Sequence, residues 1–259
     1  MERPAVLITG GAKRIGSRIA RRLGAAGWHV VVHYGQSRDE AEALAAQLPS
    51  AECVSCDLAD SAAAVAMVRE LAGLLGDWRL LVNSAAVFRF DDGAGLDSAV
   101  FDEAAVVNAR TPAMLAQAFL AHARAAGGRR VISLTDMKLA NPNPDFFSYS
   151  MAKAALAMAV RMQAMAGATG AVNDPRDRVY ALAPGAMLPS FDQQPQEHEA
   201  SGRMNLLARL TDADELADAA LWLTEGWLAS GETLFVDSGQ HLLAQPRDVL
   251  YLARETPAP

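Results

Sequence analysis

The stretch AVLITGGAKRIG, from Ala5 to Gly16, places an apolar run directly before a glycine-rich turn. The run Ala5–Thr9 predicts a buried strand, and the amphipathic residues Gly16–Ala25 predict a helix after the turn. Gly10 and Gly16 would let the backbone turn sharply and approach a pyrophosphate, which the free N–H groups of a helix N-terminus bind well. Because any tight turn between a strand and a helix favours glycine, this pattern alone is a weak indication of nucleotide binding.

The same alternation of strand and helix continues along the chain. Its strand-like segments are short and apolar without alternating polar positions, which is typical of a parallel sheet covered by helices on both faces. We therefore expect an α/β fold over residues 1–259, a Rossmann-type doubly wound sheet in a single domain. The expected strands are Ala5–Thr9, His29–His33, Glu52–Ser55, Leu80–Asn83, Arg130–Leu134, Arg178–Leu182 and Leu234–Asp237. The expected helices are Gly16–Ala25, Arg38–Leu48, Ala62–Leu75, Asp102–Ala126, Tyr149–Ala168 and Ala213–Leu223.

Three segments have the composition of loops. They are Asn141–Phe147, Gly170–Asp177 and Pro184–Arg203. The last is long, rich in Gln and Glu, and follows a strand end, and active-site lids often have these features. We expect a substrate lid at residues 184–210 and a C-terminal tail at residues 241–259.

Composition and charge argue against several classes of protein. The net charge of −7 disfavours a nucleic-acid binder, because phosphate contacts need clustered Lys and Arg. No uncharged apolar run reaches the length of about 18 residues that suggests a membrane span, and the N-terminus has no cleavage pattern of a signal peptide, so we expect a cytoplasmic protein. Cys53 and Cys56 lie in a strand-like segment and no other Cys exists to complete a zinc site, so we expect no metal.

The basic pair Lys13–Arg14 and the end of the second strand indicate which dinucleotide fits. Loops that bind NAD leave the ribose to an acidic residue at that strand end. Here the end reads HYGQS, from His33 to Ser37, and no carboxylate is present to repel the extra phosphate of NADP. Arg14, with His33 and Ser37, could bind that phosphate through charge-assisted hydrogen bonds, which favours NADPH. The alternative is that Lys13 and Arg14 are only solvated loop charges.

A tyrosine and a lysine one helical turn apart, Tyr149 and Lys153, form the next candidate site. A tyrosine phenol has a pKa near 10, which is too high for efficient proton exchange at neutral pH. An ammonium group one turn away stabilises the phenolate and lowers that pKa. We therefore expect Tyr149 to be a proton donor that Lys153 tunes, whereas the same pair without a cofactor loop upstream would be an ordinary surface pair.

Asp136 stands thirteen positions before Tyr149, where a serine hydroxyl would be easier to explain. An ionised carboxylate accepts hydrogen bonds and cannot donate one to a ketone oxygen. Asp136 would instead suit a substrate that presents N–H groups or a ring nitrogen that must be protonated. Thr135 is the alternative, because a shift of one residue would bring its hydroxyl into the site and make the protein an ordinary carbonyl reductase.

Taken together, these motifs resemble the short-chain dehydrogenase/reductase family over nearly the whole chain. The closest resemblance is to its pteridine reductase branch, including the dihydromonapterin reductases, on three features: Arg14, the HY pair followed by a polar turn, and Asp136. The family motifs are TGGAKRIG (Thr9–Gly16), DL (Asp57–Leu58), NSAA (Asn83–Ala86), Asn108 in VVNARTP, YSMAK (Tyr149–Lys153), APG (Ala183–Gly185) and VDSG (Val236–Gly239).

The resemblance implies an NADPH-dependent reductase that transfers hydride to a C=N bond of a pteridine substrate. The alternatives are a carbonyl or 3-oxoacyl thioester reductase and a non-catalytic NADP-binding regulator. The catalytic residues that the resemblance implies are Asp136, Tyr149, Lys153 and Asn108. Of these, Asn108 would order a proton-relay water. The implied cofactor contacts are Gly10, Lys13, Arg14, Ile15, Gly16, His33, Tyr34, Ser37, Asp57, Leu58, Asn83, Ser84, Ala85, Tyr149, Lys153, Pro184 and Gly185.

The implied substrate contacts are Arg14, Phe88, Asp136 and Tyr149. The residue that aligns directly with the usual stacking aromatic is Val87, so Phe88 would have to shift slightly to stack on a pterin. Family members are usually tetramers, and the helices expected at Asp102–Ala126 and Tyr149–Ala168 are rich in Ala and Met. We therefore expect a homotetramer in which Arg247 or its neighbours approach another subunit's site.

Overall fold

The computed structural model describes residues 3–168, 174–190 and 192–255. These residues form one seven-stranded sheet in the order β3-β2-β1-β4-β5-β6-β7, and every neighbouring pair of strands is parallel. Parts of the expected loop at 170–177, the expected lid at 184–210 and the expected tail at 241–259 fall outside the described residues. None of the helices in the described parts is long and apolar enough to cross a membrane.

The expected strands are all present, and their ends differ from expectation by at most two residues. Two of them, β1 and β5, have the expected bounds, whereas β6 continues through Ala183 and Pro184. The strands are β1 (Ala5–Thr9), β2 (His29–Tyr34), β3 (Ala51–Ser55), β4 (Trp78–Asn83), β5 (Arg130–Leu134), β6 (Arg178–Pro184) and β7 (Thr233–Val236).

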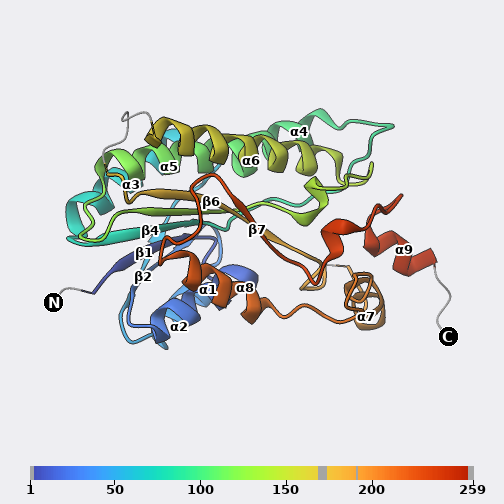
Figure 1. Cartoon of the computed structure of the whole chain (residues 1–259), viewed down its shortest axis with the longest axis horizontal. Coiled ribbons are helices and arrows are strands. Elements are labelled where there is room, and N and C mark those ends of the chain that lie inside the picture. Colours follow the sequence, from blue (N-terminus) through green and yellow to red (C-terminus); the bar gives the residue numbers. More distant parts are fainter. Residues whose placement is uncertain (1–2, 169–173, 191, 256–259) are drawn as a thin grey trace.

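Helices cover both faces of the sheet, so the doubly wound arrangement is confirmed (Figure 1). In Figure 1, α3 (Ser61–Leu74), α4 (Ser98–Ala104), α5 (Thr111–His122) and α6 (Phe147–Ala168) lie above the sheet. Below it lie α1 (Arg14–Ala25), α2 (Arg38–Ala45) and α8 (Ala213–Leu223). Two short helices, α7 (Pro195–Gly202) and α9 (Val249–Glu255), pack against each other beside one end of the sheet.

The core consists of two apolar layers, one on each face of the sheet. Strand β1 supplies both layers, because successive side chains of a strand point to opposite faces: Leu7 enters one layer, and Val6 and Ile8 enter the other. A central strand that is buried on both faces therefore contains only apolar residues until Thr9. This burial explains why the strand-like segments lack alternation.

The helix expected at Asp102–Ala126 is not a single regular helix. The chain forms α4, then a π-helical turn at Ala105–Arg110, and then α5, which ends at His122. Asn108 belongs to this π-helical turn, and its side chain makes two hydrogen bonds with the backbone of Val87, each 2.8 Å long. A π turn inserts one extra residue into the helical repeat, and such turns are frequent at functional sites. Sequence periodicity cannot reveal it, because Asn108 is held by a residue on another segment.

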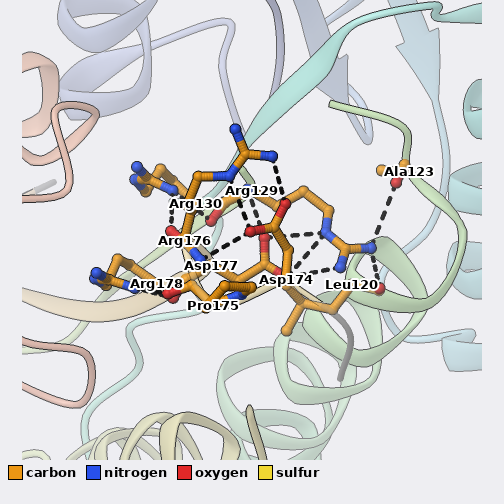
Figure 2. Close-up of polar contacts among 9 residues, drawn as sticks. All are labelled: Leu120, Ala123, Arg129, Arg130, Asp174, Pro175, Arg176, Asp177 and Arg178. Carbon is orange, nitrogen blue, oxygen red and sulfur yellow. Dashed lines mark hydrogen bonds and ion pairs between the residues drawn. The ribbon is translucent and has the colours of Figure 1, made fainter. Parts of the chain in front are cut away.

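An ion pair between residues just before β5 and β6 joins the amino ends of these two strands (Figure 2). Arg129 donates to Asp177 from its backbone N–H (2.7 Å) and from Nε and Nη2 (3.2 and 2.6 Å). The same guanidinium also donates to the backbone oxygens of Leu120 and Ala123, at the end of α5. Arg129 and Asp177 are only 11% and 8% exposed, so this contact links α5, β5 and β6 with little access to water.

Replacing Asp177 with alanine should lower the free energy of unfolding by about 2 to 3 kcal/mol, because the Arg129 guanidinium would remain buried without its carboxylate. Urea denaturation of the two proteins measures this difference. The matched control is Asp174→Ala in the same turn, since Asp174 pairs with the exposed Arg176 and should contribute much less. Equal losses in the two variants would contradict the assignment.

Candidate active site

A cleft of about 440 Å³ opens at the carboxyl ends of the central strands. It is lined by residues that directly follow β1, β4, β5 and β6, including Gly10, Ser84, Thr135 and Gly185. Ligands of doubly wound folds bind at this edge, near the point where the strand order reverses. The expected site residues that line the cleft are Gly10, Lys13, Arg14, Ile15, Gly16, Ser84, Ala85, Phe88, Asp136, Tyr149, Lys153, Pro184 and Gly185.

The glycine turn between β1 and α1 requires glycine for steric reasons. Gly10 has a φ of +60°, and a Cβ atom there would lie 2.9 Å from the Cα of Ala85. A Cβ atom on Gly16 would lie 2.3 Å from the carbonyl oxygen of Gly10, which is closer than any real contact. Glycine at position 16 therefore lets the start of α1 approach the end of β1, and glycine at position 10 lets the turn approach the segment after β4.

His33 contacts the backbone of this glycine turn, whereas we expected it to contact the phosphate of the cofactor. The backbone N–H of Gly10 donates to His33 Nδ1 at 3.2 Å, so Nε2 carries the proton and donates to the backbone oxygen of Cys56 at 3.1 Å. Burial lowers the pKa of His33 to about 4, so the ring is neutral at neutral pH. A neutral ring with both nitrogens engaged has no donor for a phosphate. The expected phosphate contact is therefore corrected to a support of the turn.

Two cationic side chains, Lys13 and Arg14, lie at the mouth of the cleft. Arg14 begins α1 with a φ of +51° and its Nη1 donates to the backbone oxygen of Pro189 at 2.9 Å. Lys13 pairs with the exposed Glu40 at 3.2 Å. Ser37, directly before α2, makes no side-chain capping bond in that helix. Arg14 thus reaches from the glycine turn toward the segment after β6, across one side of the cleft.

Several expected cofactor contacts lie outside the cleft lining. Tyr34 and Leu58 are buried, and Asp57 uses its carboxylate to accept from the N–H of Ala59 at 2.9 Å. Asn83 donates from Nδ2 to the backbone oxygen of Pro112 and to Ser133 Oγ, each at 3.2 Å. These contacts hold neighbouring strand ends and helices together, so Asn83 acts on the cleft through the elements it joins.

Tyr149 and Asp136 face each other across the cleft wall. The Tyr149 hydroxyl donates to Asp136 Oδ2 at 2.9 Å, and the backbone N–H of Lys138 donates to Asp136 Oδ1 at 2.8 Å. Thr135, the alternative candidate, is buried, and its hydroxyl lies 3.5 Å from the backbone oxygen of Leu182 in β6. The side chain that meets the phenol is therefore the carboxylate, and the threonine hydroxyl points to the sheet.

The protonation of this pair differs from the expectation that a nearby lysine lowers the pKa of Tyr149. Removal from water raises the pKa of Tyr149 well above 10, and the adjacent Asp136 carboxylate raises it further. The Lys153 Nζ lies 5.7 Å from the centre of the Tyr149 ring and donates to the backbone oxygen of Leu134 at 2.6 Å, and burial lowers the pKa of Lys153 to about 8. Burial also raises the pKa of Asp136. Burial thus favours the protonated, neutral forms of both Tyr149 and Asp136.

Phe88 lies where it can form one wall for a flat substrate. Its ring packs edge-on against Tyr149 with centroids 4.7 Å apart, and it stacks on Phe146 at 4.1 Å. Phe88 lines the cleft together with Asp136 and Tyr149, whereas Val87 is held by the backbone contacts with Asn108. Of the two neighbours Val87 and Phe88, it is therefore Phe88 that lines the cleft.

Comparison with known proteins agrees with this geometry. Residues 10–241 match a family model described as enoyl-(acyl carrier protein) reductase. The chain is a short-chain dehydrogenase/reductase. The crystal structure of FolM alternative dihydrofolate reductase 1 from Brucella canis, complexed with NADP, is 34% identical, with a TM-score of 0.85 over 93% of this chain and 94% of that chain.

Two further relatives show the range of the family. Pteridine reductase 1 from Leishmania tarentolae is 29% identical over 92% of this chain and 96% of its own length. Dehydrogenase/reductase SDR family member 4 from Homo sapiens is also 29% identical, over 90% of this chain and 86% of its own length. This short-chain dehydrogenase/reductase is therefore an oxidoreductase with pteridine and dihydrofolate reductases among its relatives.

The segment expected to be a lid contains a helix that its polar sequence did not predict. Helix α7 begins after Gln194 with a capping box, in which Glu197 accepts from the Gln194 N–H at 2.9 Å. His198 and Ser201 of α7 line the cleft, and so does Gln193. The signal for this helix was Pro195 at its first position, which is favourable at a helix start.

The C-terminal segment also contributes to the cleft, through Asp248, Val249 and Leu250. Arg247 pairs with the buried Asp145 at 2.8 Å, within its own chain. Arg247 thus has an ion-pair partner within its own chain, and its approach to another subunit's site stays a prediction. The Asp145 carboxylate is buried and also accepts from the backbone N–H of Asp248 at 2.7 Å. The segment therefore forms part of the cleft wall in its own chain.

Asp91 is another residue that sequence analysis missed. It is buried and accepts from both the backbone N–H and the hydroxyl of Ser148, in the first turn of α6. Because Tyr149 and Lys153 lie on α6, this contact helps to set where both side chains stand. Asp91 and Ser148 are 57 positions apart, and no local motif connects them.

Proposed function

We propose that this protein reduces a C=N bond of a pteridine, with NADPH as the hydride donor. The observation that carries the proposal is the Tyr149–Asp136 pair, because a carboxylate stands where a ketone reductase needs a hydroxyl donor. A pterin presents N–H groups that a carboxylate can accept and a ring nitrogen that needs a proton when the bond is reduced. Phe88 supplies a flat apolar surface beside this pair.

NADP(H) fits the residues at the other end of the cleft. The cradle formed by Gly10 and Gly16 excludes side chains where a pyrophosphate must approach, and the strand end from His33 to Ser37 has no carboxylate. Arg14 and Ser37 would hold the phosphate of the adenosine ribose, and Lys153 would bind the nicotinamide ribose. When bound, NADPH supplies the hydride for the reaction.

The chain's own groups supply protons and orientation. Asp136 enters the step protonated and, with Tyr149, donates the proton that the ring nitrogen takes up. The carboxylate left behind can then accept hydrogen bonds from the N–H edge of the substrate. Asn108 widens the helix beside Val87 and would order a water that resupplies this proton. The residues at 184–210, including α7, would exclude bulk water when substrate is bound.

Steady-state assays with dihydrobiopterin, dihydromonapterin, dihydrofolate and a panel of ketones test the proposal. We expect NADPH oxidation with at least one pteridine and little activity with ketones. Efficient reduction of a ketone or an acyl thioester without pteridine activity would contradict it and would favour the carbonyl reductase alternative.

Cofactor choice gives a separate prediction. Replacing Arg14 with alanine should weaken NADPH binding about ten- to hundredfold and change NADH binding little, because a charge-assisted phosphate contact is lost. Fluorescence titration of the two cofactors measures both affinities. Arg18→Ala is the control, because Arg18 pairs with Asp214 of the neighbouring helix α8 and should leave the selectivity unchanged. Unaltered selectivity in Arg14→Ala would contradict the assignment.

The surface of α6 supports the expected assembly. Its side chains Met151, Met158, Met162 and Met165 are 45% to 69% exposed and follow one another along one side of the helix. Large apolar side chains gathered on one surface commonly mark an interface. We expect light scattering at micromolar concentration to give four times the mass of one chain, and a monomeric mass would be inconsistent with this assembly.

A further inference from the structure

Lys138 is a buried lysine that the proposed chemistry does not use. It is one of only three lysines in the chain, and only 4% of its surface is exposed. Burying an ammonium group is costly unless it is paired, so a buried lysine calls for a physical explanation. Its Nζ donates to the backbone oxygen of Asp145 at 2.5 Å and to Asp248 Oδ2 at 3.3 Å, and it lies 5.4 Å from the centre of the Phe146 ring.

The position of this ion pair connects it to Asp136. The backbone N–H of Lys138 donates to Asp136 Oδ1, so the lysine lies on the turn that holds the carboxylate. Asp248 precedes α9 and caps it by accepting from the N–H of Leu250 at 3.1 Å. Both Lys138 and Asp248 line the same cleft as Asp136, although they come from segments about a hundred residues apart.

Few charged groups act on Asp136 among the described residues. From α6 the neighbours are Tyr149, which donates to the carboxylate, and the cationic Lys153. Burial is the largest cause of the raised pKa of Asp136; the charge of Asp248, from the segment before α9, also raises this pKa, and the charge of Lys138, from the turn after β5, lowers it. The two members of one ion pair therefore act on the same carboxylate in opposite directions.

We propose that Lys138 and Asp248 are positioning residues whose opposed charges set the proton occupancy of Asp136. The C-terminal segment supplies one charge and the turn after β5 supplies the other. The C-terminal segment thus affects the protonation of Asp136 in addition to lining the cleft. The kinetic consequence of this inference rests on the proposed function, but the electrostatic consequence does not.

The direct test is the titration of Asp136 by ¹³C NMR of protein labelled at the aspartate carboxyl carbon, with Asp136→Asn to assign the signal. Lys138→Met removes the cation and keeps the backbone N–H, so the pKa of Asp136 should rise by on the order of one pH unit. Asp248→Asn removes the anion, so the pKa should fall by a similar amount. The double variant should return close to the wild-type value, and Lys138→Arg should remain near it.

A purely structural ion pair would give a different result. Loss of either partner would then loosen the segment and move the titration in the same direction, or not move it, and either outcome would overturn the inference. Arg254→Met is the matched control, because it breaks the ion pairs of α9 with Asp192 and Glu197 and should leave the Asp136 titration unchanged.

The pH profile of pteridine reduction adds the kinetic arm. Because donation needs the protonated acid, activity should fall as the pH rises through the pKa of Asp136. Lys138→Met should extend activity to higher pH, and Asp248→Asn should confine it to lower pH. Opposite NMR shifts without pteridine activity would refute the proposed function and retain the ion-pair inference. Pteridine activity without opposite NMR shifts would refute the ion-pair inference and support the proposed function.

Discussion

Replacing Asp136 with alanine should lower the turnover of a dihydropterin by about 10²–10⁴-fold and leave NADPH binding nearly unchanged. The carboxylate accepts from Tyr149 and lies at the substrate end of the cleft, so its loss removes an interaction that matters most in the transition state. Stopped-flow turnover and a fluorescence titration of NADPH measure the two quantities separately. A loss of NADPH affinity equal to the loss of turnover would show that the variant had damaged the fold or the cofactor site instead.

Asp136→Ser is the sharper variant, because it restores the hydroxyl donor that ketone reduction uses. It should lose pteridine reduction and gain measurable reduction of a diketone. Thr135→Val is its control, since the Thr135 hydroxyl points to Leu182 in β6 and should matter little to turnover. If Thr135→Val abolished activity and Asp136→Ser barely changed it, the protein would be a carbonyl reductase built around the threonine.

Replacing Tyr149 with phenylalanine should also reduce turnover by about 10²–10⁴-fold, because the proton donor is removed while the ring remains against Phe88. The pKa of Tyr149 is raised by burial and by Asp136, so the phenol stays protonated throughout the working pH range. Turnover of the unaltered protein should therefore show no alkaline step that depends on phenol ionisation. Single-turnover kinetics across the pH range provide the measurement.

A double variant tests whether the phenol and the carboxylate act as one unit. Residues that share one proton-transfer function give strongly non-additive losses. Asp136→Ala combined with Tyr149→Phe should then be scarcely slower than the slower single variant. If the loss of turnover in the double variant equalled the product of the two single losses, the two side chains would have separate roles, such as substrate binding and proton donation.

The architecture was largely predictable from the sequence, because it depends on patterns that neighbouring residues carry. Strands β1 and β5 have the predicted bounds, and the glycine turn lies between β1 and α1 as predicted. A strand buried on both faces must be apolar throughout, and a turn that excludes a Cβ must contain glycine. Local steric and burial requirements of this kind restrict the residue types at neighbouring positions, so they can be recognised in the sequence.

The sequence also placed Asp136, Tyr149 and Phe88 in one cleft, because the carboxyl ends of parallel strands and the helices that follow meet at the same edge of the sheet. It did not determine how these groups interact. Whether Thr135 or Asp136 meets the phenol depends on the direction of each side chain at the end of β5. The residue spacing to Tyr149 differs by only one between these two candidates.

Only the tertiary structure decided the charges and protonation of the site. The sequence suggested that His33 contacts a phosphate and that Lys153 lowers the pKa of Tyr149, but burial and distant backbone partners give both residues other roles. The pairing of Lys138 with Asp248 joins positions that no local pattern connects. A pKa depends on desolvation and on all charges nearby in space, whatever their separation in the chain. Local sequence patterns therefore indicated which groups reach the cleft, and only the folded chain determined what each of them can do there.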